Sequence, residues 1–150
     1  MSDERYKVSV TWMQGREGWA QAPDVRERLL VSAPPEFGGQ PGTWSPESLL
    51  VLSAAGCYLS TFLFLVEREG LTLIGYHADA EGRLERVPGT GFRFAEIIIR
   101  PMVMVESEEG VAVARRLLEK AERACIVANS LKTPVRVEAQ VEAMAPLLNG

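Results

Sequence analysis

The feature that most constrains this chain is an uncharged, largely apolar run of about 18 residues from Leu49 to Val66. Ser45 can cap a helix that contains this run, and Pro46 fits the first helical position. Gly70 is typical of the residue that follows a helix. The sequence therefore predicts a helix from Pro46 to Glu69, about 36 Å long at about 1.5 Å per residue.

A helix that is apolar on every face must be covered on every face. One small sheet can cover only one side, so we expect a second copy of the protein on the other side. The run is also at the lower length limit of a membrane span. However, Glu47 and Glu67 flank it, with no positive-inside bias. We therefore expect a buried helix and no membrane interaction.

The rest of the chain alternates between strand-like and helix-like patterns. Apolar and polar residues alternate in residues 5–13, which predicts a half-buried strand, and a second helix should begin near Ser107. A turn is expected near Gly82, and Pro101 indicates an edge strand or a bulge. The further expected strands are residues 19–22, 25–32, 71–80, 92–105 and 135–144. This order predicts a single α+β domain over residues 1–150 with a mainly antiparallel sheet.

Composition excludes some classes of function. A net charge of -4 and a pI near 5.1 argue against nonspecific nucleic-acid binding, which needs a basic surface. The charged N-terminus shows no signal peptide, so we expect a cytoplasmic protein. The single histidine, His77, is expected to be a half-buried strand residue, and a metal site is weakly supported. No phosphate-binding glycine motif is present.

The chain has two cysteines, and 67 residues lie between them. Cys57 is in the apolar helix, where a thiol is usually an inert small hydrophobic group. Burial raises the pKa of such a thiol, and the helix dipole is weak in mid-helix, so a reactive Cys57 requires a nearby cation. Cys125 follows the second helix, near its negative end, and is better suited to resolving than to attacking. Only the fold could bring the two within disulfide distance.

Two charged residues are candidates for the same site. Glu47 is either a first-turn acid or a carboxylate that grips an arginine guanidinium. It precedes Cys57 by about 15 Å along one helix, too far to share a site within one subunit. An antiparallel copy of the helix could place Glu47 of one chain beside Cys57 of the other. Arg16 lies in a glycine-flanked turn, where most such residues are simply solvated.

These segments together resemble the OsmC/Ohr family of cysteine-based hydroperoxide reductases. Residues 42–57, from GTWSPESLL to AAGC, resemble the segment of the family that joins its glutamate to its first cysteine. Residues 125–131, CIVANSL, are similar to the family's CPVSNAL, with Ile126 in place of proline and Ala128 in place of serine. Residues 14–18, QGREG, resemble the hairpin that carries the family's arginine. The likeness covers nearly the whole chain.

The resemblance implies an OsmC-like fold and an intertwined homodimer with two sites at its interface. It further implies that Cys57 is the peroxidatic thiolate, Cys125 the resolving thiol, and Arg16 with Glu47 the activating pair. Organic hydroperoxides, and hydrogen peroxide as a further option, would be the substrates. A small external dithiol, for example a lipoyl group, would be the reductant, with no bound cofactor. Two other functions remain open: a small-molecule-binding dimer with structural cysteines, and a redox sensor that binds a protein partner.

Overall fold

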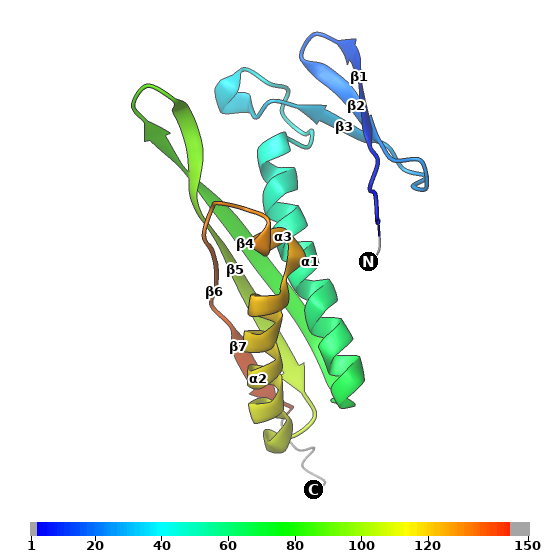
Figure 1. Cartoon of the computed structure of the whole chain (residues 1–150), viewed down its shortest axis with the longest axis vertical. Coiled ribbons are helices and arrows are strands. Elements are labelled where there is room, and N and C mark those ends of the chain that lie inside the picture. The colour runs from blue at the N-terminus through cyan, green and yellow to red at the C-terminus, as the bar shows by residue number, and fades with distance from the viewer. Residues whose placement is uncertain (1–2, 145–150) are drawn as a thin grey trace, which may run out of the picture. The chain divides into compact units, whose positions relative to one another are not determined.

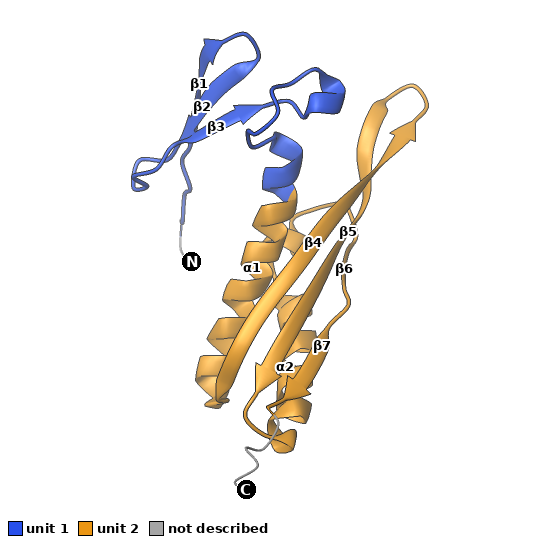
Figure 2. Cartoon of the chain, turned by 180° about the vertical axis from the view of Figure 1, so that it is seen from behind, with its two compact units in different colours: residues 1–50 blue, residues 51–150 orange. Residues whose placement is uncertain are grey.

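The computed structural model describes residues 3–144, which form two compact units divided between Leu50 and Val51 (Figure 2). The first unit contains β1 (Ser9–Gln14), β2 (Glu17–Gln21), β3 (Leu29–Ser32) and the short 3₁₀ helix η1 (Pro35–Phe37). Helix α1 (Pro46–Glu69) begins in the first unit and continues in the second. The remaining elements, shown in Figure 1, are β4 (Leu73–Val87), β5 (Gly91–Val105), α2 (Glu108–Ala124), α3 (Ile126–Asn129), β6 (Val135–Val137) and β7 (Gln140–Ala143). The predicted α+β class is confirmed, whereas the single domain stays a prediction.

The first unit is a three-stranded antiparallel sheet in the order β1-β2-β3. Gly15 and Arg16 form the turn between β1 and β2, and Gly15 has the positive φ of 51° that glycine adopts without strain. The prediction that residues 5–13 form a half-buried strand is wrong for the isolated chain. Tyr6 is 92% and Trp12 is 75% exposed, because no described element of this unit covers that face.

Helix α1 has the predicted bounds, and both of its ends are capped. Ser45 and Ser48 bond reciprocally, each main-chain N–H donating to the other's hydroxyl at 3.1 Å. At the other end Gly70 adopts a φ of 74°, and the N–H of Leu71 donates to the carbonyl of Val66. This is a Schellman motif, which fixes where the helix stops.

One face of α1 is buried and the opposite face is not. The buried residues recur at helical spacing: Ala54, Tyr58, Phe62, Leu65 and Val66. Leu52, Leu63 and Phe64 are between 41% and 56% exposed. Within the described residues, α1 is the one helix whose length and composition would allow it to cross a membrane, a property it shares with core helices of globular proteins. Unlike the fully surrounded helix that we expect, α1 in a single chain leaves apolar side chains uncovered.

The sheet of the second unit is built on two long antiparallel strands, β4 and β5. The turn predicted near Gly82 is wrong, since β4 continues through this residue. A Cβ on Gly82 would lie 2.6 Å from the Phe94 ring and 2.7 Å from Val51. This glycine is therefore needed for close packing between sheet and helix, and not for a change of direction. From Val51 onward α1 lies with α2 over the same face of this sheet (Figures 1 and 2).

Strand β5 has a second neighbour along its other edge, where β6 and β7 pair with it in parallel. The single final strand predicted from residue 135 is thus two short strands. Pro101 lies between the residues of β5 that pair with β6 and those that pair with β7. A proline has no N–H to donate, so it fits the point where β5 changes partner.

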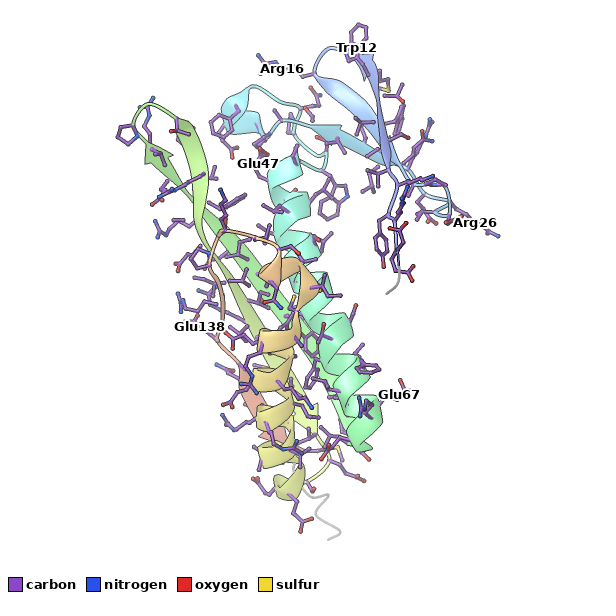
Figure 3. The ribbon with its side chains drawn as sticks, in the orientation of Figure 1. Trp12, Arg16, Arg26, Glu47, Glu67 and Glu138 are labelled. Atoms are coloured by element: carbon purple, nitrogen blue, oxygen red, sulfur yellow. The ribbon has the colours of Figure 1, made fainter. Side chains whose placement is uncertain are left out.

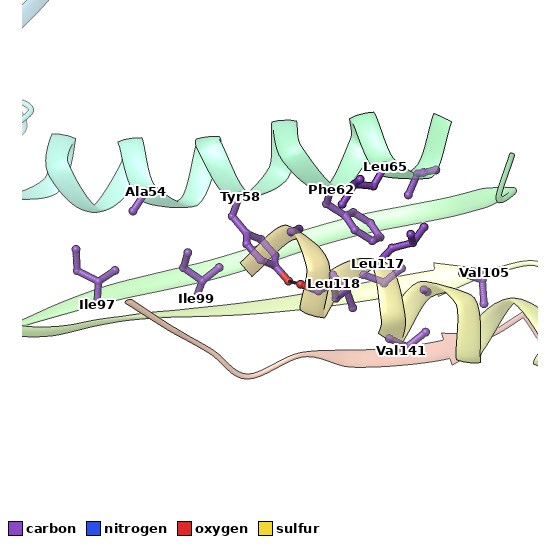
Figure 4. Close-up of a cluster of buried hydrophobic side chains, with 14 residues drawn as sticks. Ala54, Tyr58, Phe62, Leu65, Ile97, Ile99, Val105, Leu117, Leu118 and Val141 are labelled. Atoms are coloured by element: carbon purple, nitrogen blue, oxygen red, sulfur yellow. Dashed lines mark hydrogen bonds between the residues drawn. The ribbon is translucent and has the colours of Figure 1, made fainter. Parts of the chain in front are cut away.

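The core of the second unit joins α1, α2 and β5 (Figure 4). Ile97 and Ile99 of β5 are completely buried, as are Ala54 and Phe62 of α1. The Tyr58 hydroxyl donates a buried hydrogen bond of 3.0 Å to the carbonyl of Leu118 in α2. This contact connects the two helices a short distance from the cysteines.

Candidate redox site

The two cysteines come together in the second unit, although 67 residues lie between them. Cys57 lies on α1, and Cys125 is the one residue between α2 and α3. The backbone of Cys125 is extended, with φ of −67° and ψ of 113°, so the chain turns before α3 begins. The N–H of Val127 then donates to Cys57 Sγ at 3.5 Å, and the two thiols are near enough to shift each other's pKa.

Helix α3 supplies main-chain donors to this site. Its first internal hydrogen bond runs from the N–H of Asn129 to the carbonyl of Cys125 at 3.0 Å. The N–H groups of the residues in between have no helical acceptor, as at any helix start. They are therefore free to donate to the thiols, and Val127 does so.

The pKa of the Cys57 thiol is lowered from its ordinary value. Burial alone raises it, but hydrogen bonds from the Val127 N–H, the Cys125 thiol, the Ile126 N–H and the Thr61 hydroxyl together outweigh burial. All four donors are uncharged. Neutral donors thus lower this pKa, and the expectation that a reactive Cys57 requires a nearby cation stays a prediction.

Cys125 has the opposite environment. Its side chain is 1% exposed, and burial raises the pKa of its thiol, as do the charge of Cys57 and the hydrogen bond to it. The N–H groups of Ala128 and Val127 lower this pKa, but by less than burial and Cys57 together raise it. Both thiols are free, and Cys57 is the more accessible. The geometry therefore allows Cys57 to attack a substrate and Cys125 to react with Cys57 afterwards.

The two predicted charged residues lie in the first unit (Figure 3). Arg16 is exposed in the turn between β1 and β2, where its Nη1 donates to the Phe37 carbonyl at 2.6 Å. Glu47 is in the first turn of α1, and its Oε2 is buried with no hydrogen-bond partner among residues 3–144. In the described part of a single chain, no ion pair joins Arg16 to Glu47.

The histidine is not part of this site. His77 is exposed, contrary to the half-buried position expected, and its Nε2 lies 3.1 Å from Asp79 Oδ1. No group of three or more histidine, cysteine, aspartate or glutamate side chains is placed to hold a metal ion in the part of the chain that the structure describes.

Sequence reasoning missed two components of the site. Thr61 is four residues after Cys57, a spacing that places both side chains on one face of a helix. That spacing could have indicated the contact. Helix α3, in contrast, has four residues and no side-chain cap, so its main-chain donors leave no signal in the sequence.

Comparison with known proteins identifies the family to which this chain belongs. The family model described as "OsmC-like protein" matches residues 38–140, so the chain belongs to the OsmC family. The uncharacterized protein YmaD of Bacillus subtilis (strain 168) is 29% identical over 98% of both chains.

Solved structures of low sequence identity share the fold. An OsmC-like protein of unknown function from Vibrio cholerae is 20% identical, with a TM-score of 0.82 over 91% of this chain and 99% of that chain. An organic hydroperoxide resistance protein OsmC from Legionella pneumophila is 22% identical, with a TM-score of 0.74 over 95% of this chain and 99% of that one. The OsmC-like fold expected from the sequence is thereby confirmed.

Proposed function

We propose that this protein is a thiol-dependent peroxidase that reduces organic hydroperoxides to alcohols. Membership of the OsmC family points to redox chemistry of this kind. The observation that carries the proposal is the pair of inequivalent thiols: a partly accessible Cys57 with a lowered pKa, near a buried Cys125 whose pKa is raised. A nucleophilic thiolate beside a protonated resolving thiol is what such a reaction requires.

In the proposed reaction, the Cys57 thiolate attacks the distal oxygen of the hydroperoxide and the O–O bond breaks. The alkoxide takes up a proton and leaves as the alcohol, while Cys57 becomes a sulfenic acid. The sulfur of Cys125 then attacks that of Cys57, water leaves, and a disulfide forms. An external dithiol, for example a lipoyl group, restores both thiols by exchange and is itself oxidised to a disulfide.

The proposal includes a homodimer whose two sites each use residues of both chains. The exposed apolar side chains on α1 and along β1 would be covered by the second copy. The buried, unpaired oxygen of Glu47 needs a donor, since such an atom is costly to leave unsatisfied. In the dimer Glu47 would hold the guanidinium of Arg16 beside the partner's thiol, where the cation would polarise the O–O bond.

This chemistry suits the cytoplasm, where thiols are kept reduced. The experiment that tests it follows consumption of cumene hydroperoxide with dithiothreitol as the reductant. The wild type should consume the peroxide, and Cys57→Ser should not. Absence of consumption by the wild type, or equal consumption by Cys57→Ser, would instead indicate a binding protein with structural cysteines.

A further inference from the structure

We propose that the end of η1 and the open space at Gly38 form a binding seat for the Arg16 guanidinium, and that Gly38 is a positioning residue for this cation. The inference deepens the proposed function, because it rests on Arg16 as the cation that acts on the thiolate of Cys57. It concerns where the guanidinium is held, and so it can be tested without a peroxide.

The guanidinium of Arg16 binds the C-terminal end of η1. Its Nη1 donates at 2.6 Å to the carbonyl of Phe37, the last residue of this 3₁₀ helix and 21 positions further along the chain. The N–H groups of Phe37 and Gly38 close the turn itself by donating to the carbonyls of Pro34 and Pro35, each at 2.9 Å. The last carbonyls of a helix have no donor within it, and arginine side chains can hydrogen-bond them. Arg16 thus caps a turn that is distant in sequence.

Gly38 leaves free the space that the guanidinium occupies. Its φ is 87°, which glycine adopts without strain. A Cβ at this position would lie 2.5 Å from Arg16 Nη1 and 3.1 Å from Arg16 Cζ, both shorter than van der Waals contact. These atoms are at the far end of a flexible side chain, so a methyl group would displace the guanidinium at little steric cost to the fold. The missing side chain of Gly38 therefore determines where Arg16 is held.

The seat is attached to the same sheet that carries Arg16. The residue after Gly38 is Gly39, where a Cβ would overlap the carbonyl oxygen of Ala33, so the two main chains pass very close to each other. The N–H of Gln40 donates at 3.0 Å to the hydroxyl of Ser32, a buried residue of β3. Strand β3 pairs with β2, which begins directly after Arg16. The arginine and its seat are thus two parts of one hydrogen-bonded unit, as a positioning role requires.

A seated arginine is better prepared for the proposed reaction than a mobile one. A guanidinium has five N–H donors in a fixed plane, so one bond to the Phe37 carbonyl leaves donors for further acceptors. In the proposed site these acceptors are the carboxylate of Glu47 and the partner's thiolate. Holding the long side chain in advance reduces the entropy that is lost when the cation meets the thiolate. We therefore expect the thiolate of Cys57 to be most stable when Gly38 keeps the seat open.

Gly42 is a matched control in the segment between η1 and α1. Its φ is 83°, close to that of Gly38, but a Cβ there would meet no described atom within 4 Å beyond its chain neighbours. Gly38→Ala and Gly42→Ala therefore place the same residue in the same strained backbone conformation, and only Gly38→Ala obstructs Arg16. Gly38→Asn and Gly42→Asn form a second pair with less strain, since asparagine tolerates a positive φ better than alanine does.

The experiment measures the pH dependence of Cys57 alkylation by iodoacetamide, with each cysteine followed by mass spectrometry. Cys125, which faces Cys57 in the same chain, and Glu47 of the proposed site are kept in every variant. Arg16→Ala should raise the midpoint by about 1 pH unit, because it removes the cation. Gly38→Ala should raise it by about 0.5 pH unit and slow alkylation at neutral pH by about threefold, whereas Gly42→Ala should follow the wild type. In the Arg16→Ala background, Gly38→Ala should cause no further shift.

Equal midpoints for Gly38→Ala and Gly42→Ala would overturn the proposal, as would an unmoved midpoint in Arg16→Ala. A shift by Gly38→Ala that is the same with and without Arg16 would overturn it too, because it would reflect a general change in the loop. Folding is checked by circular dichroism, and the asparagine pair decides the question if an alanine variant does not fold. A protein without peroxidase activity could still give the expected shifts, and a peroxidase could lack them, so the failure of each proposal is distinguishable.

Discussion

Oxidation of the protein by one equivalent of an organic hydroperoxide should increase its stability. In the proposed reaction this treatment joins Cys57 to Cys125, whose thiols are near enough to shift each other's pKa. The bond would link α1 to the junction of α2 and α3 across the 67 residues that lie between the cysteines. Such a link restricts the unfolded chain far more than the folded one.

Loop-closure entropy gives the size of the effect. A closed loop of this length is worth about 4 kcal/mol at 25 °C. Part of this stabilisation is offset in the folded state, because a disulfide sulfur accepts the Val127 N–H less strongly than a thiolate does. The weaker hydrogen bond costs about 1 kcal/mol. We expect a net increase of about 2 to 4 kcal/mol in the free energy of unfolding, or roughly 5 to 15 °C in Tm.

The assay compares urea unfolding of the peroxide-treated and reduced protein at one protein concentration, since unfolding of a dimer depends on concentration. Peptide mapping by mass spectrometry confirms which cysteines are joined. Cys125→Ser is the control, because it cannot close the loop and should not gain stability. The reasoning is refuted if the mapped Cys57–Cys125 disulfide forms and the two unfolding curves coincide, or if peroxide joins cysteines of different chains instead.

Three further predictions concern the core and the surface. Tyr58→Phe should lower the free energy of unfolding by about 1 kcal/mol, because it removes the hydrogen bond to the Leu118 carbonyl. Tyr76→Phe should be nearly neutral, because the buried Tyr76 hydroxyl has no partner among the described residues. Equal losses of the two variants in urea unfolding would contradict this. Burial raises the pKa of Tyr76 from 10.0 to about 12, so the folded state resists ionisation of this phenol. The free energy of unfolding should therefore fall as pH rises from 10 to 12, and it should fall less steeply in Tyr76→Phe. Parallel pH profiles of the wild type and Tyr76→Phe would be evidence against this. Leu63 is 41% exposed on α1, and Leu63→Lys should give folded monomers in sedimentation velocity. Met102 is 45% exposed on β5, and Met102→Lys should remain dimeric. A dimeric Leu63→Lys protein would exclude α1 from the interface.

The parts of the fold that could be predicted are those fixed by local chemistry. The bounds of α1 follow from Ser45 and Gly70, because capping depends on residues at the helix ends. The hairpin at Gly15 is similarly local. Gly82 shows where such reasoning stops: a glycine typical of a turn is instead required by the side chains of Phe94 and Val51, which are distant in sequence.

The candidate site divides in the same way. The structure brings Cys57 and Cys125 together and gives their thiols pKa shifts of opposite direction, while the separate roles inferred for them stay a prediction. The sequence could not predict the donors of α3, because unpaired N–H groups belong to every helix start and carry no residue signature. The pairing of Arg16 with Glu47 stays a prediction, since it depends on a second copy of the chain.

The most direct test of the account is the number of hydroperoxide molecules that each chain reduces in the presence of excess dithiol. We predict many turnovers of cumene hydroperoxide per chain for the wild type and none for Cys57→Ser. Consumption of one equivalent and no more would indicate a redox sensor. No consumption at all, with both thiols reduced at the start, would contradict the peroxidase directly.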